Sequence, residues 1–116
     1  MVQQLASRFP TLKRLDLGRN KLGDATAQAL GDLLSSGWPL KTLNLKGNYV
    51  GDAGAQRLAK VIAMHPAIHM NLEKNKLGET GKDAIRDALI TVLRRGENPN
   101  VQPYDLLTEA RAAVAS

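Results

Sequence analysis

The chain has 116 residues, of which 43% are hydrophobic, and a formal net charge of +5 at pH 7. Its length predicts a single domain. Because it contains no cysteine, a disulfide framework, a thiolate nucleophile and a cysteine-based metal site are excluded. No apolar run approaches the roughly 18 residues of a membrane span, and the N-terminus lacks the basic start and apolar stretch of a secretory signal. The sequence therefore predicts a cytoplasmic protein.

The positive charge raises nucleic acid as a partner, but the basic residues are scattered. The closest basic clusters are pairs, Lys13-Arg14 and Arg94-Arg95. Nucleic-acid surfaces usually combine a basic stripe with aromatic side chains that stack on bases, and no aromatic residue lies within a basic run here. We therefore expect solvated charged faces rather than a nucleic-acid interface.

Residues 1–11 have the pattern of the end of a helix. Leu5 and Pro10 occupy the places that Leu34 and Pro39 hold at the end of a later helix. A partial first unit is therefore predicted here. It is either a piece of a longer array or a worn N-terminal cap.

The rest of the chain is dominated by a repeat. The block Leu15-Asp16-Leu17-Gly18-Arg19-Asn20-Lys21-Leu22-Gly23-Asp24 returns 28 residues later, at residues 43–52, and again 27 residues after that, at residues 70–79. A period of this length indicates stacked supersecondary units. We place the three units at about residues 12–39, 40–66 and 67–96.

Each unit is predicted to begin as a strand, because its leucines alternate with polar residues. The asparagine three positions after the second inward residue (Asn20, Asn48 or Asn75) is expected to be buried and to bond the backbone of the neighbouring turn. A Gly-Asp or Gly-Glu pair then turns the chain, and its acidic residue suits the start of a helix.

The helix of each unit carries an apolar face with the spacing i, i+3, i+7. The positions are Ala27, Leu30 and Leu34, then Ala55, Leu58 and Ile62, then Lys82, Ile85 and Leu89. Since Lys82 replaces the small alanine, the third helix is expected to be splayed or more exposed at its start. Strand and helix in alternation predict parallel strands with the helices on one side.

The repeat pattern ends after Gly96, because the next inward positions fall on Glu97 and Pro99. No fourth strand of this type is expected. Residues 97–116 are predicted to form a loop and a helix, at about 104–114, that caps the stack. A mobile tail and a docking helix for a partner are the alternatives. The apolar stripe of this helix consists of Leu106, Leu107, Ala110 and Val114.

Aligned from Leu12 and Leu40, the first two units read Leu-x-x-Leu-x-Leu-x-x-Asn-x-Leu/Val, followed by Gly-Asp and a helix with Ala-x-x-Leu. This pattern resembles the leucine-rich repeat, specifically the ribonuclease-inhibitor-like subtype of about 28 residues. The resemblance covers roughly residues 12–95. It implies an α/β fold, a short curved right-handed solenoid with strands on the concave face, helices on the convex face and a C-terminal helical cap. The third unit departs from the pattern, with Ala67 and Met70 in place of leucines.

Similar repeats in ribonuclease inhibitor, NOD-like receptors, Ran GTPase-activating protein and bacterial secreted effectors hold macromolecules. The resemblance therefore implies a protein–protein interaction module and not an enzyme. Side chains that alternate with the inward leucines face outward on the strand side, and Tyr49 occupies a turn beside them. The predicted partner-binding residues are Arg14, Asp16, Arg19, Thr42, Asn44, Lys46, Tyr49, His69, Asn71, Glu73 and Lys74.

This surface is smaller than the 20–30 residues per partner of a standard interface. Three units should therefore bind weakly, recruit the loops at Tyr49 and Lys76, or belong to a longer parent; self-association through an exposed end is a further option. Tyr49 is preferred as a partner contact over Trp38, which is expected to cover the edge of the core.

No catalytic, cofactor-binding or metal-binding residue is predicted. His69 could have Asp16 and Glu73 as neighbours, but no serine or cysteine lies among the outward residues. The alternatives to a simple binding module are a GTPase-activating or other regulatory partner of an enzyme, with Arg19 as the residue to test, a secreted bacterial effector fragment acting in the host cytosol, and a purely structural fragment.

Overall fold

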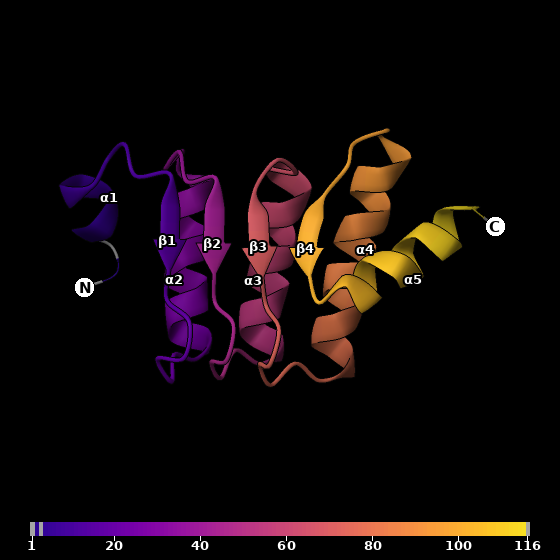
Figure 1. Ribbon diagram of the computed structural model, residues 1–116, viewed down its shortest axis with the longest axis horizontal. Helices are drawn as coiled ribbons and strands as arrows, with labels where there is room; N and C mark the ends of the chain where they lie inside the picture. Colours follow the sequence, from indigo (N-terminus) through magenta and orange to yellow (C-terminus); the bar gives the residue numbers. More distant parts are fainter. Residues whose placement is uncertain (1, 3, 116) are drawn as a thin grey trace.

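The computed structural model describes residue 2 and residues 4–115 of the chain. The strands of this part form one parallel sheet in the order β1-β2-β3-β4, and α2, α3 and α4 stand in a row behind it (Figure 1). The predicted stack of parallel strands with the helices of the repeats on one side is confirmed. The elements are α1 (Gln4–Arg8), β1 (Arg14–Asp16), α2 (Asp24–Ser35), β2 (Thr42–Asn44), α3 (Asp52–Met64), β3 (His69–Asn71), α4 (Glu79–Arg94), β4 (Asn100–Gln102) and α5 (Tyr104–Ala115).

The register of the sheet places equivalent residues of successive units opposite one another. Leu15 lies opposite Leu43, Leu43 opposite Met70, and Met70 opposite Val101. Neighbouring strands are about 4.8 Å apart, whereas packed helices are about 8–10 Å apart. A stack with helices on one side therefore curves toward its strands, and the strand side is the concave side.

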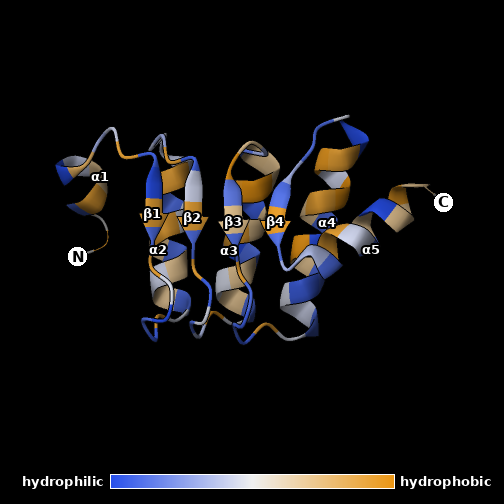
Figure 2. Cartoon of the chain, in the orientation of Figure 1, coloured by the Kyte–Doolittle hydropathy of each residue, from blue (hydrophilic) through white to orange (hydrophobic). Residues whose placement is uncertain are grey.

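The inward side chains of the units share one core, with hydrophobic residues recurring in the middle of each strand and along the helices behind (Figure 2). Leu45 and Leu72 are buried, while Leu17 at the N-terminal end is half-buried. The ladder continues past the strands: the backbone N–H of Leu17 donates to Asn44 O at 2.9 Å, and that of Leu45 donates to Asn71 O at 2.9 Å. In the third unit Ile68, and not Ala67, is the buried residue before the strand.

The asparagine prediction is confirmed for Asn48, which is 1% exposed. Its Nδ2 donates to Leu17 O and Leu45 O, and its Oδ1 accepts from the N–H groups of Asn20 and Leu22, all at 2.9 Å. Asn75 forms similar bonds one unit later, although it is half-buried and not buried as predicted. Its Nδ2 donates to Leu45 O at 2.8 Å and its Oδ1 accepts from the N–H of Val50 at 2.9 Å.

The same prediction is wrong for Asn20, because its side chain is exposed. Its Nδ2 donates to Gly18 O, only two residues away, at 3.1 Å. The described chain contains no turn on the N-terminal side of Asn20 whose backbone this amide could bond. Burial of the asparagine therefore depends on a preceding unit and not on the asparagine itself.

The acidic residues at the helix starts bond the next unit rather than their own helix. Asp24 Oδ1 accepts hydrogen bonds from the N–H groups of Gly51 (2.6 Å) and Gly54 (3.1 Å) at the start of α3. Asp52 Oδ1 accepts from Gly78 (2.7 Å) and Gly81 (2.9 Å) at the start of α4. Each carboxylate thus satisfies N–H groups that a helix N-terminus leaves unpaired. These bonds tie each unit to the unit that follows it.

The prediction that no fourth strand follows Gly96 is wrong. β4 pairs with β3, and Val101 is buried opposite Met70. The strand comes later than the repeat predicts because α4 has 16 residues, compared with 12 in α2 and 13 in α3. The extra helical turn shifts the next strand along the chain. The segment 97–103 is therefore a loop with a strand in it.

The C-terminal helix covers the end of the stack, as predicted. In α5, Leu106, Leu107 and Ala110 are buried against the core, while Val114 is half-buried. The Arg86 guanidinium on α4 bonds Glu109 Oε1 on α5 at 2.6 Å and also bonds Asp83. The hydrogen bond to Asp83, and then that to Glu109, raise the pKa of Arg86 above its ordinary value, so this link stays charged.

At the start of α4, Lys82 is half-buried and its helix remains packed through Ile85 and Leu89, which are fully buried. The predicted greater exposure is therefore confined to the lysine. At the other end of the molecule α1 is a short helix, and Leu5 packs partly buried against the core. Trp38 is buried, as predicted, and its Nε1 donates to Phe9 O at 3.0 Å.

Candidate functional site

The outward side chains of the sheet form rows that run across the strands, which we call the strand face. The register places Arg14, Thr42 and His69 in one row and Asp16, Asn44 and Asn71 in the next. A shallow hollow of about 350 Å³ lies over these two rows. The structure thus brings together six of the predicted partner-binding residues as direct neighbours.

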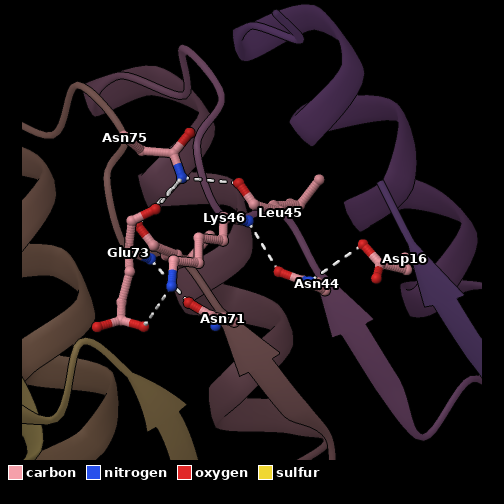
Figure 3. A network of polar contacts seen from close by, with 8 residues as sticks. Asp16, Asn44, Leu45, Lys46, Asn71, Glu73 and Asn75 are labelled. Carbon is pink, nitrogen blue, oxygen red and sulfur yellow. Dashed lines mark hydrogen bonds and ion pairs between the residues drawn. The ribbon is translucent and has the colours of Figure 1, made fainter. Parts of the chain in front are cut away.

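The second row is held in place by hydrogen bonds within the strand face (Figure 3). Asp16 Oδ1 accepts from Asn44 Nδ2 at 3.0 Å and from the N–H of Gly18 at 2.9 Å. Asn44 Oδ1 accepts from the N–H of Lys46 at 2.9 Å, and Asn71 Oδ1 accepts from the N–H of Glu73 at 2.9 Å. These bonds fix the polar groups on a rigid surface before a partner arrives.

The loops that follow the strands continue the strand face with charged residues. Lys46 Nζ lies 4.0 Å from Glu73 Oε1, and both side chains are about one-third exposed (36% and 37%). A pair at this distance and exposure contributes little to stability. Both groups therefore remain available to a partner at small cost.

Arg19 and Lys74 occupy the equivalent position one residue further along, which is Gly47 in the unit between them. All three have positive φ, 60° for Arg19, 73° for Gly47 and 57° for Lys74. This left-handed conformation is free for glycine but costs a residue with a Cβ roughly 1–2 kcal/mol. Both cations are exposed, so no burial of their side chains offsets that cost.

Tyr49 lies in the turn after β2 and is 51% exposed. Its ring faces Lys76 of the next unit, whose Nζ is 5.8 Å from the ring centroid. Trp38 is buried and only 7% exposed. The preference for Tyr49 over Trp38 as a partner contact therefore agrees with their exposure, and Trp38 has a structural role.

Three residues of the strand face were missed because β4 was not expected. Asn100 and Gln102 extend the two rows beside His69 and Asn71. Tyr104, at the start of α5, is 50% exposed, and its hydroxyl donates a hydrogen bond to Asn100 Oδ1 at 3.1 Å. The signal was present in the alternation Asn100-Val101-Gln102, with one apolar residue between two polar ones.

His69 does not form the carboxylate pair that the sequence suggested. Its neighbours in the row are Thr42 and Asn100, and no hydrogen bond in the described part of the chain joins it to Asp16 or Glu73. Nor do the described residues contain a group of three or more histidine, aspartate or glutamate side chains that could hold a metal ion.

Positive charge prevails along the strand face and its loops. Arg14, Arg19, Lys21, Lys74 and Lys76 are exposed there, and within residues 4–115 none of them forms an ion pair. The acidic residues on the same surface already have partners. Asp16 accepts hydrogen bonds from Gly18 and Asn44, and Glu73 faces Lys46.

Comparison with known families agrees with this architecture. The model of the family described as Leucine Rich repeat matches residues 10–31 and 39–59. No curated protein matches the chain. β3 and β4 continue the same parallel geometry outside the matched residues. Among the described residues no helix is long and apolar enough to cross a membrane.

Proposed function

Because residues 10–31 and 39–59 match the leucine-rich repeat and β3 and β4 continue the same parallel sheet, we propose that the chain is a protein-interaction module that binds its partner through the strand face and the adjoining loops. One observation carries the proposal. The second polar row is accessible and yet fixed by hydrogen bonds, as the bonds from Asn44 to Asp16 and from the backbone N–H of Lys46 to Asn44 illustrate. A surface ordered in advance loses little conformational entropy on binding. No catalytic role is part of the proposal.

The area of the strand face supports a partner that also touches the loops. A standard interface uses about 20–30 residues per side. β4 widens the face by Asn100, Gln102 and Tyr104, and Tyr49 and Lys76 lie in the turns beside it. The proposed contact surface therefore comprises Arg14, Asp16, Arg19, Thr42, Asn44, Lys46, Tyr49, His69, Asn71, Glu73 and Lys74 together with these added residues.

A substitution that covers the strand face with a large uncharged side chain tests the proposal. Thr42 lies in the middle of the first row and lines the hollow, so Thr42→Trp fills the contact surface without changing its charge. Thr91→Trp, at an exposed threonine of α4 on the helix side of the stack, is the matched control. Both variants are used as bait, with the wild type, in affinity capture followed by mass spectrometry.

We expect a protein that the wild type and Thr91→Trp capture to be absent with Thr42→Trp, while all three proteins melt within about 3 °C of one another. Equal capture by Thr42→Trp and Thr91→Trp would refute binding through the strand face. Charge reversal at Arg14, Lys46 or Lys74 should weaken the same capture, whereas reversal at Lys60, exposed on α3, should not.

Regulation of an enzyme is the second candidate function, and Arg19 is the observation that favours it. The residue is exposed on a loop whose backbone N–H is fixed to Lys46 O at 2.9 Å, and an arginine presented on a rigid loop can stabilise charge in phosphoryl transfer. The test is GTP hydrolysis by a panel of GTPases with and without the protein. Unchanged hydrolysis rates would end this candidate.

We further propose that the N-terminal end can associate with a second copy. β1 is the edge strand of the sheet, and Leu15 and Leu17 are half-buried although their equivalents Leu43 and Leu45 are fully buried. An antiparallel pair of β1 strands about Leu15 would also set each Arg14 opposite an Asp16, a favourable cross-strand pair. Sedimentation velocity from 10 to 500 µM, with Leu15→Lys as the variant, tests it; a monomer at all concentrations would refute it.

A cytoplasmic location, or the host cytosol for a secreted effector, remains a proposal that accompanies these functions.

A further inference from the structure

We propose that the partner presents an acidic segment to the strand face, and that Arg19 and Lys74 bind two of its carboxylates. This inference rests on the proposed protein-interaction function and names the chemistry of the partner. The segment crosses the loops from the first to the third unit, above Gly47.

The backbone of Arg19 and Lys74 supplies the first argument. The equivalent position of the middle unit is Gly47, which shows the residue that the local geometry prefers. Arg19 and Lys74 adopt the same left-handed conformation at an energetic cost, and their side chains form no ion pair within the described part of the chain. Strained residues are typical of functional sites. A binding role for the two cations accounts for their presence at positions that favour glycine.

Gly47 supplies the second argument, because the absence of a side chain there makes room for the stem of Arg19. A Cβ placed on Gly47 would lie 3.0 Å from Arg19 Cγ, so the stem of Arg19 leans over the middle unit. Below it a shallow hollow of about 250 Å³ is lined by Asp16, Gly18, Arg19, Asn44 and Lys46. A ligand group that enters this hollow meets Arg19 and Lys46, while Lys74 lies outside it, in the third unit.

The balance of charge supplies the third argument. The cations near this hollow have no ion-pair partner within residues 4–115 apart from the weak pair of Lys46 with Glu73, and the Asp16 carboxylate is engaged by Gly18 and Asn44. The surface is therefore complementary to negative charge, and such complementarity favours an oppositely charged partner.

The spacing of the cations indicates the form of the segment. The Cα positions of Arg19 and Lys74 belong to units separated by two strand spacings, about 10 Å. In a polyproline-type helix, residues three apart point the same way and are separated by about 9.3 Å. The segment that fits is thus an extended one with the pattern acidic-x-x-acidic.

A polypeptide fits this surface better than a nucleic acid. The rows of amides offered by Asn44, Asn71 and Gln102 can bond a peptide backbone. Asp16 and Glu73 interrupt the cations of this face, so two separate carboxylates suit it better than a chain that carries a charge at every phosphate. Nucleic-acid surfaces also use aromatic platforms for base stacking, and the two cations flank a glycine.

The test is a titration of the ¹⁵N-labelled protein with the peptide acetyl-Gly-Pro-Glu-Pro-Pro-Glu-Pro-Gly-amide, followed by NMR. Its analogue with both glutamates changed to glutamine is the control ligand. The protein variant is Arg19→Gly/Lys74→Gly. The matched control with the same net charge is Lys41→Gln/Lys60→Gln, at two exposed sites outside the loops that follow the strands.

We expect the glutamate peptide, but not its glutamine analogue, to shift the NMR signals of the backbone amides of Arg19, Lys46, Gly47 and Lys74. Affinity should fall at least tenfold in Arg19→Gly/Lys74→Gly and less than twofold in the control variant. The melting temperature of the glycine variant should be equal to or above that of the wild type, because glycine relieves the strain. Loss of binding then cannot result from unfolding.

Equal shifts with the glutamine peptide, or unchanged affinity of the glycine variant, would overturn the inference. Tighter binding of a ten-nucleotide oligouridine to the same amides would overturn it in favour of nucleic acid. If the glycine variant still captures a partner that Thr42→Trp loses, this inference fails and the protein-interaction function stands. If both variants capture the partner equally, the proposed function fails with it.

Discussion

Replacement of Asn48 by alanine should destabilise the protein more than any other asparagine substitution in the repeats. The Asn48 side chain makes four hydrogen bonds at 2.9 Å, two as donor and two as acceptor, and it is 1% exposed. At about 1 kcal/mol of net stability for each bond, the loss is about 4 kcal/mol. The substitution also leaves the carbonyls of Leu17 and Leu45 without the donor Asn48. The loss of stability therefore stays near 4 kcal/mol even if water reaches the N–H groups of Asn20 and Leu22.

The measurement is urea unfolding followed by circular dichroism, with Asn20→Ala as the matched control. Asn20 is the same residue type at the equivalent position, but its side chain is exposed and, within the described residues, bonds Gly18 O alone. Its substitution should therefore cost under about 1 kcal/mol. A loss of about 4 kcal/mol is a large part of the roughly 5–15 kcal/mol available to a domain. If the two variants differ by less than about 1 kcal/mol, the role assigned to burial is wrong.

Three further predictions concern contacts between units and at the ends of the stack. Asp52→Ala should lower the free energy of unfolding by about 1–2 kcal/mol, because it removes the cap of α4. The Glu79 side chain is 82% exposed, so Glu79→Ala should change this free energy by less than about 0.5 kcal/mol. Urea unfolding measures both. Trp38→Phe should cost about 1 kcal/mol through loss of the bond to Phe9 O and should accelerate trypsin cleavage after Arg8; an unchanged cleavage rate would contradict this anchoring role. Glu109→Gln should increase hydrogen exchange in α5 but not in α3, because Arg86 loses its charged partner on α5 and keeps Asp83 on α4. It should change the melting temperature little because Glu109 is half exposed to solvent; equal exchange in the variant and the wild type would contradict the link.

The repeated elements could be predicted because their signals are local. Alternation of leucine with polar residues identifies the inward positions of each unit, such as Leu43 and Leu45. The i, i+3, i+7 spacing identifies the inward side of each helix. The outward set of candidate residues follows from the same alternation. The rows from Arg14 to His69 and from Asp16 to Asn71 could thus be assigned from the sequence alone.

The features that could not be predicted depend on contacts between neighbouring units, which a single repeat does not specify. Asn20 and Asn48 stand in nearly identical blocks, yet only Asn48 has a preceding unit to bond. β4 was hidden by the length of α4, since a fixed period places Glu97 and Pro99 where Val101 belongs. The bond from Asp52 to the next helix was also hidden, because an acidic residue after glycine suggests a cap of its own helix.

The bonds between units give the stack a direction. Asp24 caps α3 and Asp52 caps α4, while the buried amides of Asn48 and Asn75 reach back to the backbone of the unit before them. The first two units therefore each contribute an acidic side chain forward, and the second and third each contribute an amide backward. These groups lie at the loop end of the strands, where Arg19, Gly47 and Lys74 also lie. Because the backbone N–H of Arg19 donates to Lys46 O and that of Gly47 donates to Glu73 O, both at 2.9 Å, the three loops are tied to one another, and the cations that we propose to bind a partner are held at a fixed spacing.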